Sequence, residues 1–293
     1  MTAIRKPGKI NEDTILIDAN MMGIPRILSI YLIVSEKTCL IDTGTHIEAR
    51  KTLRQLKGLN KFPPDIIILT HSHWDHVQGL PFLSQRARKE GKEIQILALD
   101  SAIPNLRDQS FNAVFETGPF NNIEDEITSL KEGDVIDLGG INLEIFKAPG
   151  HMDDEIAILD QKNKNLFVGD VLGMKVSDNV FVPPFLPPQW DPTAYLKTID
   201  KFKRIDYDTL CLAHFGYFYG DEVKDILDES IQNCNQFWES IEDNIEHIDD
   251  VPYLIENVLE KLISKSDIEN FPEKLVQGVI YWLSQGYKIY KNL

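Results

Sequence analysis

The feature that most constrains this sequence is a short apolar run that ends in a cluster of polar side chains. Residues 66–76 read IIILTHSHWDH. A β-branched, apolar run such as Ile66 to Leu69 is typical of a buried strand. Three histidines and one aspartate then follow within six residues: His71, His73, Asp75 and His76. Because open α/β sheets keep reactive groups in the loops at strand ends, the segment predicts a functional site at one edge of a sheet.

The residue types in this cluster favour metal binding. Imidazole and carboxylate donors together suit zinc, iron or manganese, and no thiolate lies within the segment. A single histidine is more often a surface or packed residue than a ligand. Four such side chains directly after a core strand favour a metal site, and a purely structural cluster is the alternative.

Strands and helices alternate along the first 219 residues. The hydrophobic periodicity predicts an antiparallel opening followed by units of strand and helix. The expected strands are residues 14–18, 27–34, 38–42, 66–69, 94–97, 135–138, 141–146, 155–159, 166–168 and 209–213. The expected helices are residues 46–59, 77–90 and 192–203, the last with Asp191 as its cap and Pro192 at its first position. Residues 100–131 show little periodicity and predict short helix and loop.

From residue 220 onward the sequence predicts only helices. Apolar residues recur at steps of four and three, first in one long stripe and then in helices expected at 253–265 and 273–290. The chain is therefore expected to comprise a domain of residues 1–219 and a helical extension of residues 220–293. We expect the stripe to pack on neighbouring helices, with a homodimer interface as the alternative. The stripe consists of Val223, Leu227, Ile231, Cys234, Trp238, Ile241, Ile245 and Ile248.

Composition limits the classes of protein and partner. The longest apolar run, residues 27–34, is too short to span a bilayer, and residues 1–10 lack the apolar core of a secretory signal. Three widely spaced cysteines do not describe a disulfide framework, so we expect a cytoplasmic protein. The net charge is −16, and residues 220–250 hold eleven acidic residues against Lys224 alone. This charge disfavours nucleic acid as a partner, although a solvated helix face is the simpler interpretation.

Three more candidate ligands follow expected strands further along the chain. They are His151, Asp170 and His214, and Gly150 and Gly169 directly precede the first two. Glycine at these positions allows the backbone to approach closely. Since four separate strands are each followed by His or Asp, we expect these side chains to meet at one rim of the sheets.

These motifs resemble the signature of the metallo-β-lactamase superfamily, His-x-His-x-Asp-His followed by Gly-His, Gly-Asp and a late His. The resemblance covers residues 18–219 and implies an α/β fold, a four-layer αββα sandwich, here with a C-terminal helical extension. It also implies two divalent metal ions, with zinc expected and iron or manganese as alternatives. One metal would be held by His71, His73 and His151, and the other by Asp75, His76 and His214, with Asp170 as the bridge. Asp42, in the segment LIDTG, would support the site from behind the ligands, or alternatively cap a turn.

The branch of the superfamily follows from single positions. The β-lactamases of the best-known class carry cysteine where this chain has Asp170, whereas glyoxalase II and lactonases carry aspartate. Di-iron reductases of this fold carry glutamate at the position of His73. The resemblance therefore implies a binuclear hydrolase that uses a metal-bridging hydroxide on a lactone, thioester or phosphodiester of a small-molecule substrate. The alternatives are a persulfide-dioxygenase-like enzyme with one iron, a small endoribonuclease of the same fold, and a catalytically silent binding module.

Asp75 is the candidate catalytic residue. A carboxylate partly free of the metal could orient the hydroxide and pass a proton to the leaving group. The candidate pocket residues are Lys175, which could meet an anionic group, and the aromatic residues Phe185, Trp190, Tyr217 and Tyr219. The alternatives are a solvated lysine and aromatic side chains that only pack a loop.

Overall fold

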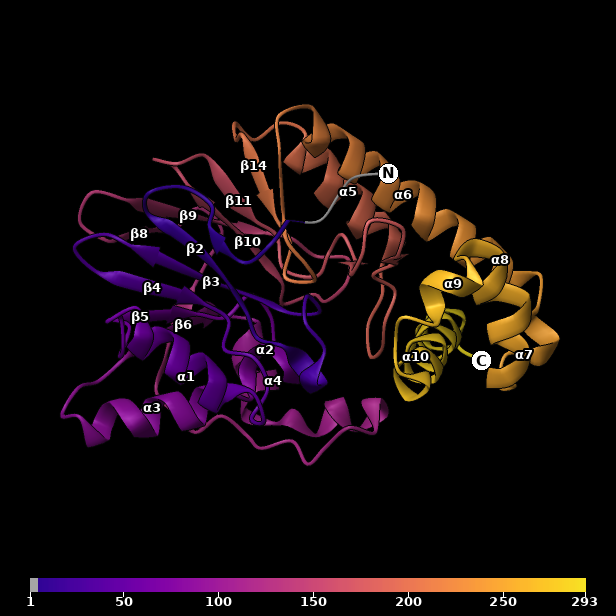
Figure 1. The fold of residues 1–293 in the computed structure, drawn as a ribbon, viewed down its shortest axis with the longest axis horizontal. Coiled ribbons are helices and arrows are strands. Elements are labelled where there is room, and N and C mark those ends of the chain that lie inside the picture. The colour runs from indigo at the N-terminus through magenta and orange to yellow at the C-terminus, as the bar shows by residue number, and fades with distance from the viewer. Residues whose placement is uncertain (1–4) are drawn as a thin grey trace.

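The computed structural model describes residues 5–293, and two β-sheets form its centre (Figure 1). The first sheet has seven strands in the order of the sequence. Strands β1 to β4 are antiparallel, and β4 to β7 run parallel. The strands are β1 (Gly8–Lys9), β2 (Thr14–Asp18), β3 (Ser29–Val34), β4 (Thr38–Ile41), β5 (Ile66–Ile68), β6 (Gln95–Leu99) and β7 (Ile127–Leu130).

The second sheet has six strands in the order β15-β14-β11-β10-β9-β8. Neighbouring strands are antiparallel except for β11 and β14, which run parallel. The strands are β8 (Val135–Asp137), β9 (Asn142–Lys147), β10 (Ile156–Asp160), β11 (Asn165–Phe167), β14 (Thr209–Cys211) and β15 (Tyr217–Tyr219).

Helices cover the outer face of each sheet, which gives four layers (Figure 1). Helices α1 (Ala49–Gly58) and α3 (Leu80–Lys89) lie on the first sheet, and α5 (Pro192–Phe202) lies on the second. Helix α5 begins where its sequence predicts, because the Asp191 carboxylate accepts hydrogen bonds from the backbone N–H groups of Thr193 and Ala194. The predicted αββα sandwich is thus confirmed.

A tyrosine and a phenylalanine join the inner faces of the two sheets. The ring of Tyr31 on β3 lies 4.9 Å from the ring of Phe167 on β11, centroid to centroid. The buried Tyr31 hydroxyl lies 2.6 Å from the carbonyl oxygen of Leu212 and 2.8 Å from that of Gly216, and it donates to this pair. The first sheet therefore fixes the turn after β14, which carries His214.

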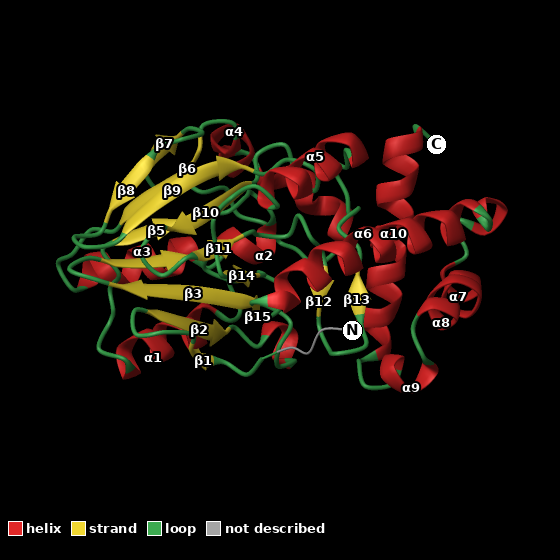
Figure 2. Cartoon of the chain, turned by 90° about the horizontal axis from the view of Figure 1, so that it is seen from above, coloured by secondary structure: helices red, strands yellow, loops and turns green. Residues whose placement is uncertain are grey.

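The C-terminal region consists of helices gathered beyond one end of the strands (Figure 2). They are α6 (Asp221–Glu242), α7 (Val251–Leu254), a π-helical turn η4 (Ile255–Leu259), α8 (Glu260–Leu262), α9 (Lys265–Ile268) and α10 (Glu273–Lys291). Within residues 5–293, no helix is both long and apolar enough to cross a membrane. Helix α10 crosses the loop after β13 so closely that a Cβ atom on Gly286 would lie 2.9 Å from the carbonyl carbon of Phe185.

The stripe predicted from residue 220 onward is partly corrected. Leu227, Cys234 and Ile241 are buried within the chain as predicted, but Ile226 and Phe237 are buried beside them. The helix ends at Glu242, before the last two residues of the stripe. Just beyond this end, the Asn244 amide donates to the carbonyl of Ser240 and so satisfies one of the last helical acceptors.

Several short elements were not predicted. Residues 100–131 contain the expected short helices, α4 (Ala102–Arg107) and a 3-10 helix η2 (Gln109–Phe115), but they also contain strand β7. Strands β1, β15 and the hairpin β12 (Met174–Lys175) and β13 (Phe181–Val182) were also missed. Strands of two to four residues at sheet edges carry too few side chains to show a period of two.

Candidate metal centre

The first candidate ligands come from the end of β5. His71 and His73 lie in the turn that follows the strand, whereas Asp75 and His76 lie on the short helix α2 (Trp74–Val77). The sequence predicted a loop here with a helix from residue 77, so the helix begins three residues earlier than expected. All four side chains are buried.

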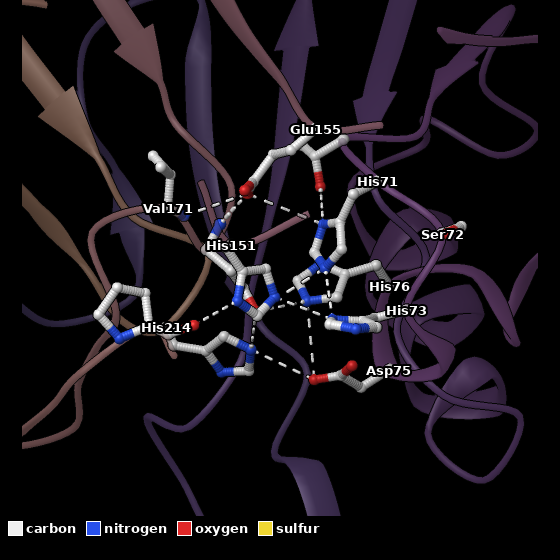
Figure 3. A network of polar contacts seen from close by, with 12 residues as sticks. His71, Ser72, His73, Asp75, His76, His151, Glu155, Val171 and His214 are labelled. Atoms are coloured by element: carbon white, nitrogen blue, oxygen red, sulfur yellow. Dashed lines mark hydrogen bonds and ion pairs between the residues drawn. The ribbon is translucent and has the colours of Figure 1, made fainter. Parts of the chain in front are cut away.

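Three other strand ends bring the remaining candidates to the same place. His151 follows β9, Asp170 follows β11 and His214 follows β14, all in the second sheet. The seven side chains form two groups, and within each group the ligand atoms lie within 4.8 Å of one another. One group is His71, His73, His151 and Asp170, and the other is Asp75, His76 and His214. Figure 3 shows the histidines and Asp75 pointing toward a common centre.

Three imidazole nitrogens converge in the first group. His73 Nδ1 lies 3.1 Å from His71 Nε2 and 2.9 Å from His151 Nε2. The other ring nitrogen of His151, Nδ1, lies 2.7 Å from the carbonyl oxygen of Pro184. Since a carbonyl oxygen only accepts, Nδ1 of His151 carries the proton, and its Nε2 presents a lone pair to the centre.

The Asp170 carboxylate lies between the two groups. Its Oδ2 atom is 3.3 Å from His76 Nε2 and 3.4 Å from His214 Nε2, both in the second group. The same atom is 3.7 Å from His151 Nε2 and 3.9 Å from His71 Nε2, both in the first. A single oxygen therefore faces four imidazoles, which is the placement that a carboxylate shared by two cations needs.

The second group is oriented by contacts on its outer side. His214 Nδ1 donates to the carbonyl oxygen of Ile27 over 2.6 Å, and His76 Nδ1 lies 2.9 Å from Asp42 Oδ2. Asp42 also accepts hydrogen bonds from the backbone N–H and the hydroxyl of Thr70. These contacts turn the Nε2 lone pairs of His76 and His214 toward Asp75, whose Oδ2 lies 3.2 Å from His214 Nε2.

The pKa values of Asp170 and His71 are shifted toward the forms that bind metal ions. Burial raises the pKa of Asp170, but His214 and His76 outweigh it and hold the pKa well below its usual range. Burial, helped by the His76 imidazole, lowers the pKa of His71 well below its usual value. Ionised carboxylate and neutral imidazole are the forms that coordinate metals.

Unpaired buried atoms support the same conclusion. His76 Nε2 and Asp170 Oδ1 have no hydrogen-bond partner among the described residues. Burial lowers the pKa of His214, yet Asp170 and Asp75 overcome this effect and raise it to about 10. The carboxylates thus favour a positive charge at His214 Nε2, and a cation bound there would take the place of that proton. The two groups could hold two metal ions.

Glu155 is a site residue that the sequence did not reveal. Its fully buried carboxylate accepts hydrogen bonds from the backbone N–H groups of Asp170 and Val171, and its Oε1 lies 3.9 Å from His71 Nδ1 (Figure 3). It therefore fixes the turn that presents Asp170. The signal available in the sequence was a charged residue at the start of the apolar run 155–159. A carboxylate in a buried strand needs a partner within the protein because water cannot reach it.

The five residues predicted to line a substrate pocket lie elsewhere. Lys175 is fully buried, and its ammonium lies 2.6 Å from the Glu229 carboxylate on α6. Phe185 packs on Trp238 with ring centroids 5.4 Å apart, and Trp190 packs on Tyr195 at 5.2 Å. Tyr217 and Tyr219 lie on β15 beside the Arg5 guanidinium, which is 4.3 Å from the ring centroid of Tyr219.

A pocket of about 870 Å³, counted with its opening to solvent, lies directly against the ligand cluster. Four candidate ligands form its polar part: His73, Asp75, Asp170 and His214. Its other lining residues, within the described part of the chain, are apolar. Neither Phe115 of η2 nor Trp282 of α10, both in the lining, was predicted as a pocket residue.

Comparisons with known proteins agree with this geometry. A metallo-beta-lactamase fold-containing protein of Sulfurisphaera tokodaii is 26% identical over 212 residues, which cover 68% of this chain and 77% of that protein. A crystal structure of an archaeal protein of this kind, from Sulfolobus tokodaii, superposes with a TM-score of 0.57 at 21% identity, covering 78% of this chain and 86% of that one. At this identity the likeness shows the fold alone.

Two further relatives carry names of enzymes. A hydroxyacylglutathione hydrolase of Haemophilus influenzae is 27% identical over 143 residues, which cover 47% of this chain and 62% of that protein. An acyl-coenzyme A thioesterase of Gallus gallus is 28% identical over 156 residues, which cover 47% of this chain and 54% of that protein. This chain therefore spans little more than half the length of these two relatives. Residues 23–214 match the family model of the metallo-beta-lactamase superfamily, and the chain belongs to that superfamily.

Proposed function

We propose that this protein is a hydrolase with two metal ions that cleaves an ester-type bond, a thioester or lactone, in a small-molecule substrate. The observation that carries the proposal is the position of Asp170 Oδ2, which faces imidazoles of both ligand groups. Two of the relatives are named as a hydroxyacylglutathione hydrolase and an acyl-coenzyme A thioesterase, which favours a thioester over a phosphodiester.

The histidines and Asp170 would hold the metal ions, and Asp75 would transfer a proton. When bound, two divalent ions would lower the pKa of a water toward about 7 and polarise the carbonyl of the ester. Asp75 borders the pocket, so a substrate there meets its carboxylate. Burial raises the pKa of Asp75, but His76 and His214 outweigh it and lower the pKa below its usual value. Asp75 therefore enters the reaction ionised, in the form that can accept a proton and pass it to the leaving group.

The test is a rate panel on protein loaded with zinc, manganese or iron, using a lactone, a thioester and a phosphodiester. We expect thioester or lactone hydrolysis that depends on two metal ions per chain. His76→Ala should remove one ion and the activity, whereas His46→Ala, an exposed histidine on the same domain, should change neither.

Two results would contradict the proposal. One iron per chain with consumption of oxygen would indicate an oxygenase instead. Cleavage confined to the phosphodiester would indicate a nuclease of the same fold.

A further inference from the structure

We propose that the substrate carries an alkyl or acyl chain, and that the C-terminal helices form the pocket that holds this chain beside the metal centre. The inference rests on the proposed function and names the substrate class for it. It is carried by the apolar composition of the pocket that borders the ligand cluster and by the continuity of its wall with that cluster.

The helical extension supplies nearly half of the pocket wall. Of seventeen apolar lining residues, eight lie beyond residue 250, in η4, α9, α10 and the turns between them. On α10, the lining residues Leu275, Val279 and Trp282 recur at steps of four and three and so occupy one face of the helix. The opposite wall comes from the β12–β13 hairpin through residues such as Val180 and Val182.

The apolar wall is continuous with the ligand cluster. The ring of Phe115 packs edge-on against the imidazole of His73, with centroids 5.2 Å apart. On its other side, Phe115 packs against Trp282 of α10 with centroids 5.5 Å apart. Asp75, Asp170 and His214 border the same space. A chain in the pocket would therefore be in contact with helix α10 while the bond it carries lies at the carboxylates.

The exposure of the lining residues locates the opening. Val180, Val182 and Leu259 are buried, whereas Phe271, Leu275 and Val276 are partly exposed. The pocket therefore reaches solvent beside α9 and the first turns of α10.

The chemistry of the wall excludes polar occupants. A sugar, nucleotide or peptide placed here would lose hydrogen bonds to water and find no partner on the apolar wall. An alkyl chain has no such groups to satisfy. Each methylene that it buries should strengthen binding about fourfold until the pocket is filled.

The wall is held in place by contacts outside the pocket. Lys175 of β12 lies on Glu229 of α6, and Gly286 of α10 lies on the backbone at Phe185. Tyr287 of α10 packs on Trp238 of α6 with ring centroids 4.5 Å apart. The extension is thus fixed to the sandwich at several points, and the pocket exists before a ligand arrives.

The test measures binding of n-alkanols of four to twelve carbons to the metal-loaded protein by titration calorimetry. Alkanols carry no bond that the protein could hydrolyse, so their binding is measured independently of catalytic activity. We expect affinity to rise about fourfold per methylene and then level off. Rates for thioesters of increasing acyl length, measured in parallel, should rise in the same manner.

Three variants locate the binding. Val279→Trp fills the pocket, so the affinity for decanol should fall about tenfold or more while that for butanol is kept. Val279→Thr keeps the shape but adds a hydroxyl, which should weaken decanol about fivefold. Ile289→Trp, at a position on the same helix that is 42% exposed, should change nothing. Thermal unfolding of each variant shows whether the fold is kept.

The outcomes separate the two proposals. Alkanol affinity independent of length, or loss of affinity in Ile289→Trp equal to that in Val279→Trp, would overturn the chain pocket. If Val279→Trp does not fold, an unchanged decanol affinity in Val279→Thr overturns it instead. Length-dependent binding without hydrolysis of any ester would support the pocket and contradict the proposed hydrolase.

Discussion

The Nδ1 atom of His76 lies 2.9 Å from Oδ2 of Asp42, on the side of the imidazole that faces away from the ligand cluster. Asp42 lies at the end of β4 with a φ of 61°, and Thr70 donates two hydrogen bonds to its carboxylate. A carboxylate so fixed holds the imidazole in one orientation and keeps its proton on Nδ1. The Nε2 atom is therefore aimed at the centre before any metal arrives.

Asp42→Asn should weaken metal binding without removing a ligand. The amide keeps the shape but loses the negative charge behind His76, so affinity for the second metal ion should fall about 10- to 100-fold. Competition with a chromophoric chelator measures this affinity. Asp206→Asn is the matched control, since the Asp206 side chain is 87% exposed and pairs with Lys164 at the surface. Equal metal affinities in the two variants would remove Asp42 from the site.

Asp75→Asn should separate catalysis from metal binding. The amide oxygen can still face the metal, but it cannot accept a proton as a carboxylate does, so the rate should fall about 10²- to 10⁴-fold. The rate of Asp75→Ala should fall by at least the same factor. Metal content by elemental analysis must accompany each rate, and Asp153→Asn, at an exposed aspartate, should behave as the unchanged protein. A near-normal rate with both metal ions bound would assign the proton transfer to another group.

Gly150→Ala should destabilise the turn that presents His151. Gly150 has a φ of 146°, and a Cβ atom there would lie 2.7 Å from Cα of Tyr195, which is backbone of α5. Overpacking of this kind costs about 1–3 kcal/mol of the free energy of unfolding. Gly58→Ala in α1 meets nothing within 4 Å and should leave stability unchanged or raise it by up to about 1 kcal/mol. Urea unfolding of both variants measures the two free energies of unfolding. If Gly150→Ala is no less stable than Gly58→Ala, the backbone of α5 does not approach Gly150 closely.

Glu229→Gln should loosen the attachment of the extension to the sandwich. The Lys175 ammonium is fully buried against Glu229, and loss of a hydrogen bond between charged groups costs about 1.5–3 kcal/mol. Asp228→Asn, at the preceding residue, removes an exposed pair with Lys203 and should cost no more than about 1 kcal/mol. Urea unfolding and alkanol binding together measure the effect. Equal stabilities would show that the buried pair does not anchor α6.

The ligand cluster could be predicted because its signal is local. His71 to His76 follow directly from an apolar run, and His151, Asp170 and His214 each follow a strand that the sequence also shows. The partners of these residues are not local. Glu155 approaches His71 only because β10 and β5 belong to sheets that pack together, and nothing near Glu155 in the sequence reports this.

The pocket could not be predicted for the same reason. Lys175 was a candidate for contact with an anionic substrate group, with a solvated lysine as the alternative, but it meets Glu229, which lies 54 residues away in the sequence. Phe185 and Trp190 looked like pocket residues because aromatic side chains in a proline-rich loop often border ligands, yet helix α6 and helix α5 cover them. Helix α10 is apolar on several faces, so its periodicity predicts burial without saying that Val279 and Trp282 border a pocket.

Gly286 determines how closely α10 approaches the loop at Phe185. Because residue 286 has no side chain, α10 rests directly on the backbone at Phe185, and Trp282 one turn earlier is held close to Phe115. Any larger residue at 286 would displace the helix outward and widen the space beside the metal centre. Relatives that differ at this one position are then expected to accept bulkier, branched molecules, although residue 286 itself touches neither metal ligand nor substrate.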